Sequence, residues 1–167
     1  RFSHAQRSKT RTWEMVYLLI ATHSTPTQIM PRLDIIHDAV KSALIKDGWV
    51  ITDDPYIIQY QKTTLYADLG AEQPMAAERC GQKIIVEVKS FIGASKIQDL
   101  KEALGQYDIY RYLLEEIAPD RKLYIAVSMI AYDSFFKQDV IQLILNKHQL
   151  PLIIVDTEIE VIKQWIS

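Results

Sequence analysis

KIIVEVK, at residues 83–89, is the stretch of this 167-residue sequence that decides the fold. The run is short and rich in β-branched residues, which predicts a buried strand. Successive strand side chains point to opposite faces, so Glu87 and Lys89 should project together while Val88 points the other way. A carboxylate and an ammonium group are costly to bury unless they have partners or a function. Two interpretations stay open: a functional pair in a buried strand, or a solvated pair on an edge strand.

The elements around this strand follow from turn signals and periodicity. Upstream, we expect a helix at 31–48, a strand at 49–52, a turn at 53–55, extended structure at 56–60, strands at 65–69 and 75–79, and a hairpin turn at 80–82. Downstream, we expect a helix from a Ser95–Gln98 capping box to about residue 116, a strand at 122–128, a helix at 134–147 and a strand at 152–155. Residues 158–166 fit either a helix or a strand. This order predicts an α/β fold, a mixed sheet with helices on its faces.

Composition limits the classes of protein that the chain can belong to. Residues 1–29 carry four Lys/Arg and one Asp/Glu, whereas residues 30–167 carry 15 Lys/Arg and 20 Asp/Glu, a net charge of −5. An acidic domain is a poor independent DNA binder, because phosphate affinity comes mainly from Lys and Arg. A single cysteine, Cys80, excludes an intramolecular disulfide and a cysteine-based zinc cluster.

The N-terminal segment differs from the rest of the chain. Its apolar run at 15–21 is too short to span a membrane, although a signal peptide stays open as an alternative. We expect residues 1–29 to be a poorly ordered extension outside the fold, and residues 30–167 to form a single domain. We expect a cytoplasmic protein with no membrane association.

An acidic residue precedes the Glu87–Lys89 strand at a suggestive position. Asp68 lies nineteen residues before Glu87, in another strand-like segment. Asp68 and Glu87 could hold Mg²⁺ or Mn²⁺, with the backbone carbonyl of Val88 as a further oxygen ligand. Lys89 would orient the nucleophile or stabilise charge in the transition state. The pattern predicts a metal-dependent phosphodiesterase site.

A second pair of residues lies on the long helix. Gln106 and Tyr110 are four residues apart and therefore share one helix face. A Gln on an apolar helix surface needs a polar partner, which a phosphate or the catalytic carboxylates would provide. The alternative is that Tyr110 belongs to the core and Gln106 is simply exposed.

Blocks of sequence from Met30 to about Trp165 closely resemble the XisH family, described as controlling factors for excision of the fdxN DNA element in filamentous cyanobacteria. The blocks are 30–32, 36–41, 44–49, 68–72, 77–78, 86–91 and 103–107. Residues 1–29 lie outside the resemblance, in agreement with an extension.

The resemblance implies a restriction-endonuclease-like fold with the PD-(D/E)xK signature. That signature falls on Asp68, Glu87 and Lys89, while Gln106 and Tyr110 are similar to the Q-x-x-x-Y motif of RecB-like nucleases. In such folds the first helix often adds an acidic residue or a His to the site. His37, Asp34 or Asp38 could supply it. One departure is Ala67, which stands where the signature has Pro.

The resemblance also implies partners. It implies a helper in programmed DNA excision that acts on DNA with a site-specific recombinase and an XisI-type controlling factor; a homo-oligomer stays open. The leading hypothesis is a Mg²⁺-dependent endodeoxyribonuclease-like protein. The competing hypothesis is a non-catalytic regulatory subunit that docks a partner.

Overall fold

Strand β5 (Gln82–Lys89) lies in the interior of a sheet, between β4 (Met75–Arg79) and β6 (Arg121–Ser128). The computed structural model describes residues 30–65 and 74–167, with side chains at 36–62 and from 74 onward. The sheet lies within the compact unit that residues 33–167 form.

Within the described residues the sheet has six strands, in the order β1-β4-β5-β6-β7-β8. The other members are β1 (Val50–Asp53), β7 (Leu152–Asp156) and β8 (Val161–Ile166). Strands β5, β6 and β7 run parallel, and the pairs at both ends of the sheet are antiparallel. A separate hairpin joins β2 (Ile58–Tyr60) to β3 (Thr63–Leu65). The predicted mixed sheet flanked by helices is therefore confirmed.

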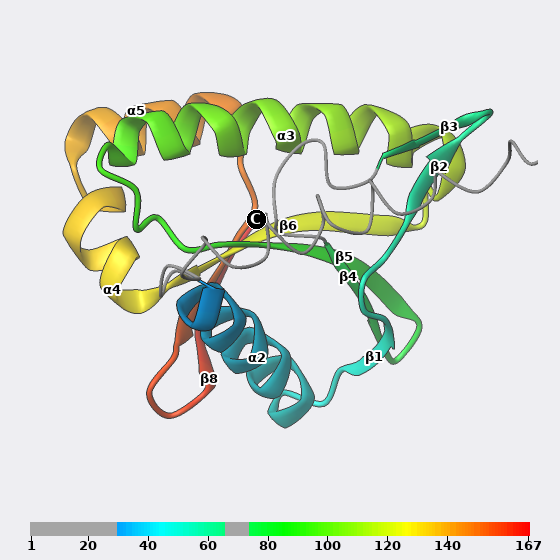
Figure 1. Cartoon of the computed structure of the whole chain (residues 1–167), viewed down its shortest axis with the longest axis horizontal. Coiled ribbons are helices and arrows are strands. Elements are labelled where there is room, and N and C mark those ends of the chain that lie inside the picture. Colours follow the sequence, from blue (N-terminus) through cyan, green and yellow to red (C-terminus); the bar gives the residue numbers. More distant parts are fainter. Residues whose placement is uncertain (1–29, 66–73) are drawn as a thin grey trace, which may run out of the picture. The chain divides into compact units, whose positions relative to one another are not determined.

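The two parallel crossovers decide which face each helix covers. Helix α3 (Lys96–Ile117) joins β5 to β6, and α4 (Met129–Ala131), the π-helix η2 (Tyr132–Phe136) and α5 (Asp139–His148) join β6 to β7. Right-handed crossovers that step in the same direction place their helices on one face of the sheet. Figure 1 shows α3 and α5 together on one side, and α2 (Met30–Lys46) on the other.

Strand alternation divides the core into two layers. Ile85 packs in the layer beneath α3 and α5, with Leu100 of α3 and Ile125 of β6. Val86 and Val88 pack in the layer beneath α2, with Leu44. Glu87, between Val86 and Val88, therefore belongs to the α3 face.

Some elements differ from the sequence-based predictions. The helix expected at 134–147 is interrupted at Lys137–Gln138, with helical turns on both sides, and residues 161–166 form strand β8. These C-terminal residues pair antiparallel with β7 and form that edge of the sheet. The strand expected at 65–69 falls mostly outside the described residues. Only Leu65 of that range is described, and it is the last residue of β3.

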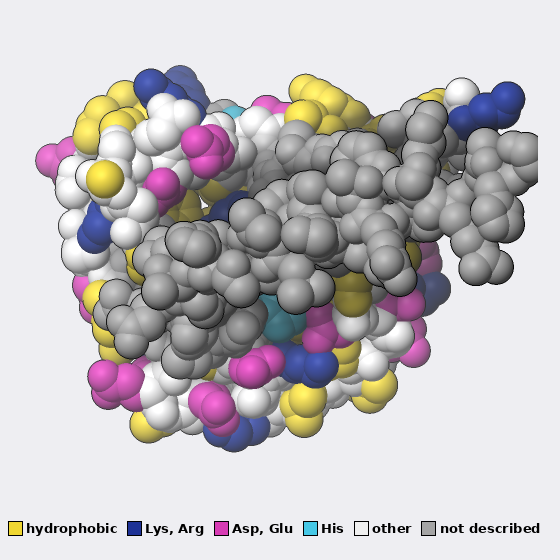
Figure 2. Space-filling view, viewed as in Figure 1, with side chains coloured by type: hydrophobic (Ala, Val, Ile, Leu, Met, Phe, Trp, Pro, Cys, Tyr) yellow, Lys and Arg dark blue, Asp and Glu magenta, His cyan; other side chains and the backbone are white. Residues whose placement is uncertain are grey.

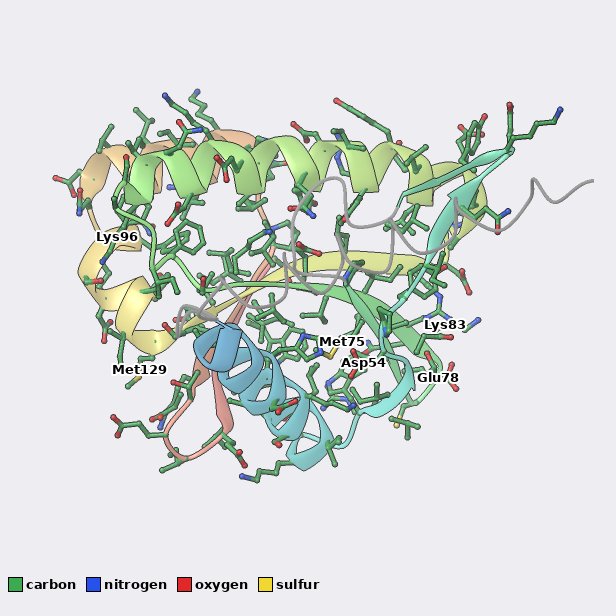
Figure 3. All side chains as sticks on the ribbon, viewed as in Figure 1. Asp54, Met75, Glu78, Lys83, Lys96 and Met129 are labelled. Atoms are coloured by element: carbon green, nitrogen blue, oxygen red, sulfur yellow. The ribbon has the colours of Figure 1, made fainter. Side chains whose placement is uncertain are left out.

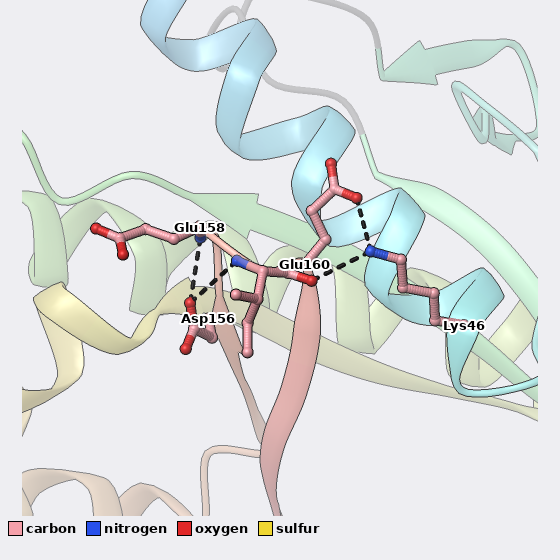
Figure 4. Close-up of polar contacts among 5 residues, drawn as sticks. Lys46, Asp156, Glu158 and Glu160 are labelled. Carbon is pink, nitrogen blue, oxygen red and sulfur yellow. Dashed lines mark hydrogen bonds and ion pairs between the residues drawn. The ribbon is translucent and has the colours of Figure 1, made fainter.

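Two turns hold the ends of the sheet. The predicted turn at 80–82 is present: Cys80 and Gly81 both have positive φ, as a tight two-residue hairpin requires. The β7–β8 turn is tied to α2, since Lys46 Nζ donates to the Ile159 carbonyl (3.1 Å) and lies 2.8 Å from Glu160 Oε2 (Figure 4). Asp156 Oδ1 also accepts from two backbone amides of this turn.

No helix among the described residues is both long and apolar enough to cross a bilayer.

Candidate functional site

Glu87 and Lys89 lie together beneath α3. Glu87 is 2% exposed, and Lys89 Nζ is 3.0 Å from Glu87 Oε1. Val88 packs on the α2 face, so the predicted alternation along the strand is confirmed. The alternative of a solvated pair on an edge strand is wrong, because β5 is an interior strand and the carboxylate is buried.

Helix α3 brings Gln106 and Tyr110 to the same layer. Ser95 caps the helix, since its Oγ accepts from the Gln98 amide (3.4 Å). Gln106 Nε2 donates to Tyr110 Oη at 2.8 Å, and both side chains are buried. The alternative of an exposed Gln106 is therefore wrong, and its amide has the polar partner that burial demands.

Electrostatics connect the helix pair to the strand pair. Burial raises the pKa of the Tyr110 phenol, and the nearby Glu87 carboxylate raises it further. The hydrogen bond from Gln106 and the charge of Lys89 act in the opposite direction on the same pKa. Tyr110 is thus close enough to Glu87 and Lys89 for both charges to affect its pKa. Glu87, Gln106 and Tyr110 are buried and Lys89 is partly exposed, and these four side chains make up the candidate site between β5 and α3.

His37 lies elsewhere. It is on α2, where its Nε2 is 2.9 Å from Asp54 Oδ1, and Lys41 Nζ donates to Asp54 Oδ2 at 2.6 Å. Figure 3 labels Asp54, beyond the end of β1. Burial acts to raise the pKa of Asp54, but hydrogen bonds from Lys41 and His37 outweigh it and lower that pKa. A catalytic role for His37 stays a prediction, and so does one for Asp38, which is exposed on the same helix.

The predicted metal ligands are only partly visible. Asp68 and the side chain of Asp34 fall outside the described residues. Among the residues that are described, no three or more His, Cys, Asp or Glu side chains gather closely enough to hold an ion. Glu87 and the Val88 carbonyl offer oxygen donors, which is the donor type that Mg²⁺ and Mn²⁺ prefer. The donor chemistry therefore fits the predicted metal, which stays a prediction.

A small cavity beside Lys89 contains acidic residues that the sequence reasoning missed. It has a volume of about 140 Å³, and Asp99 and Glu102 line it from the first turns of α3. Asp99 Oδ2 accepts from the Gly93 amide (3.0 Å), and Glu102 Oε1 accepts from Gln98 Nε2 (3.1 Å). Asp99, Glu102 and Gln106 are spaced three and four residues apart and so share one helix face. This spacing is the sequence signal from which Asp99 and Glu102 could have been predicted.

Comparison with known proteins identifies the family. The family model described as "XisH protein" matches residues 30–163. The chain belongs to the XisH family. The resemblance that the sequence blocks indicated is thereby confirmed. Among curated proteins, the comparison found no match.

Two solved structures resemble this XisH-family chain closely. One is an fdxN element excision controlling factor protein from Anabaena variabilis, with 45% identity and a TM-score of 0.73. The other is an XisH family protein from Nostoc punctiforme, with 42% identity and a TM-score of 0.73. Each match covers 80% of this chain and 99% of the other.

Proposed function

We propose that this chain is a DNA-element excision controlling factor with a divalent-metal phosphodiesterase site, built on a restriction-endonuclease-like PD-(D/E)xK core. The observation that carries the proposal is the burial of Glu87 beside Lys89, beneath the Gln106–Tyr110 pair. Structural cores rarely bury a carboxylate and an ammonium group unless both are paired or have a function. The family assignment supports a role in the excision of a DNA element, since one solved relative is described as an fdxN element excision controlling factor.

Each residue has a definite part in this proposal. Glu87, with Asp68 and the Val88 carbonyl, would hold Mg²⁺ or Mn²⁺, which supplies Lewis-acid polarisation of a phosphate and an activated water. Lys89, 17% exposed at the mouth of the site, would place its ammonium group against the scissile phosphate. Gln106 would orient Tyr110 through the hydrogen bond that its Nε2 donates to Tyr110 Oη. A tyrosine phenol is ordinarily protonated at neutral pH, and burial raises the pKa of Tyr110 further.

Purified protein incubated with supercoiled plasmid DNA and Mn²⁺ or Mg²⁺ tests the proposal. We expect nicked or linear products that disappear in Glu87→Gln and Lys89→Met. We also expect calorimetry to detect Mn²⁺ binding that Glu87→Gln weakens at least tenfold while Lys89→Met retains it. Cleavage that persists in both variants would exclude this site, and Mn²⁺ binding that is unchanged in Glu87→Gln would exclude its metal role.

The chain offers a matched control pair. Asp133 and Lys137 also form a carboxylate–lysine contact, at 2.7 Å, but on the surface of the η2 region. Asp133→Asn and Lys137→Met should leave both cleavage and Mn²⁺ binding unchanged. This pair separates loss of the buried site from the general effect of removing one charge.

A second candidate function is a non-catalytic regulatory subunit that docks a partner. The net charge of −5 over residues 30–167 favours it, because such a domain binds DNA weakly by itself. In Figure 2 carboxylate side chains are visible along the lower part of the face, with Lys and Arg side chains among them, and again at the upper left. Helices α3 and α5 also expose large apolar side chains, among them Tyr112 (57%) and Leu143 (57%).

Co-expression with an XisI-type controlling factor or with the recombinase tests this candidate. We expect a stable complex that Leu143→Lys weakens if α5 is the docking helix, with Lys137→Glu, exposed and outside α5, as the control. A regulatory role without catalysis requires that neither the isolated chain nor such a complex cleaves DNA in the presence of Mn²⁺.

A further inference from the structure

An aromatic cluster lines a cavity on the sheet face opposite Glu87. The cavity has a volume of about 430 Å³, and Trp49, Tyr124 and Trp165 contribute to its wall. The Tyr124 and Trp165 rings are edge to face at 5.1 Å, and the Trp49 and Trp165 rings are 5.7 Å apart. Trp49 and Tyr124 are buried, whereas Trp165 is half-buried and borders the open space. Trp49 and Trp165 therefore pack against each other, and Trp165 is the less buried of the two.

Three cations surround this aromatic wall. Arg79 lies over the Trp49 ring, 4.6 Å from its centroid, and Lys122 lies 5.1 Å from the Tyr124 centroid. Lys83 also lines the cavity, at the β4–β5 end of the sheet where Figure 3 labels it. The lining contains one carboxylate, Asp120. In a unit whose net charge is negative, this local excess of positive charge is unusual.

The ion pairs determine which cation is available. Arg79 is paired with Asp47 at 2.9 Å, and Lys83 is paired with Asp120 at 2.7 Å. Lys122 is exposed, and no carboxylate of the described residues pairs with it. An anionic ligand could therefore bind Lys122 directly, whereas binding to Lys83 requires that the ligand displace the exposed Asp120 carboxylate.

The cavity is separate from the candidate phosphodiesterase site. Ile84, in its lining, packs in the layer beneath α2. Glu87 is three residues along the same strand and points to the other face. Lys83 has the same parity as Glu87, but it stands at the start of β5 and lines the cavity at that end of the sheet. Ligand binding in this cavity would therefore be independent of the proposed phosphodiesterase site.

We propose that this cavity binds a nucleotide, with the base against Trp165 and the phosphate held by Lys122 and Lys83. A volume of about 430 Å³ lies in the range of small-molecule sites, roughly 300–1,000 Å³. Aromatic side chains stack with any base, and flanking lysines bind the phosphate. The nucleotide is either free or the end of a single DNA strand, since both present the same base and phosphate.

Titration calorimetry on the full chain tests the proposal, with EDTA present so that metal-dependent binding elsewhere does not contribute. The probes are AMP, adenosine, inorganic phosphate and a 5′-phosphorylated thymidine hexanucleotide. We expect saturable AMP binding that is tighter than that of adenosine or phosphate. A hexanucleotide that binds tighter than AMP identifies a strand end as the source, and one that binds no tighter identifies a free nucleotide.

Variants give the decisive comparison. Trp165→Leu should weaken AMP binding about tenfold, as loss of one base-stacking contact does. Lys122→Glu should weaken AMP binding and reduce its dependence on salt. Lys137→Glu is the control, because Lys137 also lies over a tyrosine ring, at 5.9 Å from the Tyr132 centroid, but outside the cavity.

Three results would overturn the proposal. The first is that neither AMP nor the hexanucleotide binds saturably. The second is that phosphate binds as tightly as AMP. The third is that the Lys122→Glu variant binds AMP as tightly as the unmodified chain. Circular dichroism and thermal melting verify that each variant is folded. Because Lys122 is exposed, its variant decides the question even if Trp165→Leu fails to fold.

Discussion

Lys89 Nζ and Glu87 Oε1 lie 3.0 Å apart, and Glu87 is almost fully enclosed between β5 and α3. Desolvating two charges is expensive, and their attraction offsets that cost only when both partners are present. Replacing one partner should therefore lower the stability of the folded protein more than replacing both. The pairing also explains why an apolar strand tolerates two charges on one face.

The first prediction concerns the coupling between these two residues. Lys89→Met should lower the free energy of unfolding by about 3 kcal/mol, because it removes the cation beside a buried carboxylate. The double variant Glu87→Gln/Lys89→Met should recover part of this loss, which urea unfolding in a double-mutant cycle measures. The surface pair Asp133–Lys137 should show no measurable coupling. Strictly additive effects of Glu87→Gln and Lys89→Met would contradict the prediction.

The second prediction concerns the hydrogen bond on α3. Tyr110→Phe should cost about 1–2 kcal/mol, because the buried Gln106 amide loses its acceptor. Tyr112→Phe, on the exposed face of the same helix, should have little effect. Adding Gln106→Met to Tyr110→Phe should restore part of the stability, since no unpaired amide then remains. Equal losses in the Tyr110 and Tyr112 variants would show that the bond contributes nothing.

The third prediction concerns pH. The pKa of Asp54 is lowered in the folded state, so its pairing stabilises the protein above the unfolded-state pKa and is lost as pH falls through the lower folded-state value. Asp54→Asn should therefore reduce stability by about 1 kcal/mol at neutral pH and by progressively less below about pH 4. Urea unfolding from pH 7 to pH 3 measures the difference. Asp53→Asn, its exposed neighbour, is the control, and a loss that does not depend on pH would contradict the pairing role.

Much of this architecture could be predicted from sequence because the local and tertiary signals agree. Helix α2, strands β4 to β7 and the Cys80–Gly81 turn fall where periodicity and turn chemistry place them. The tail at 161–166 could not be assigned, because an edge strand is defined by its partner, here β7, and not by its own pattern. The break near Lys137 was invisible for a similar reason, since no Pro or Gly marks it in the sequence.

The candidate site was partly predictable. The period-2 alternation of β5 and the i, i+4 spacing on α3 were enough to group Glu87 with Lys89, and Gln106 with Tyr110. That these two pairs lie in the same layer depends on tertiary structure, because the crossover places α3 over β5. The cations around Trp49 and Trp165 come from β4, β5 and β6, so no local pattern could have gathered them.

The last prediction concerns the start of α3, where the sequence motif is only half realised. A capping box requires that Ser95 accept from the backbone of Gln98 and that the Gln98 side chain return to the backbone of Ser95. The first bond is present, but Gln98 Nε2 donates instead to Glu102 Oε1 at 3.1 Å.

Ser95→Ala should therefore destabilise the protein by about 1 kcal/mol, the usual cost of losing an N-cap. Gln98→Ala should cost less than about 0.5 kcal/mol, since it removes only an exposed i, i+4 side-chain contact. Thermal and urea unfolding of both variants, with Lys101→Ala as an exposed control on the same helix, measure the difference. Equal losses at Ser95 and Gln98 would show that the reciprocal bond forms in solution, and α3 would then be held above the Glu87 site by the complete motif.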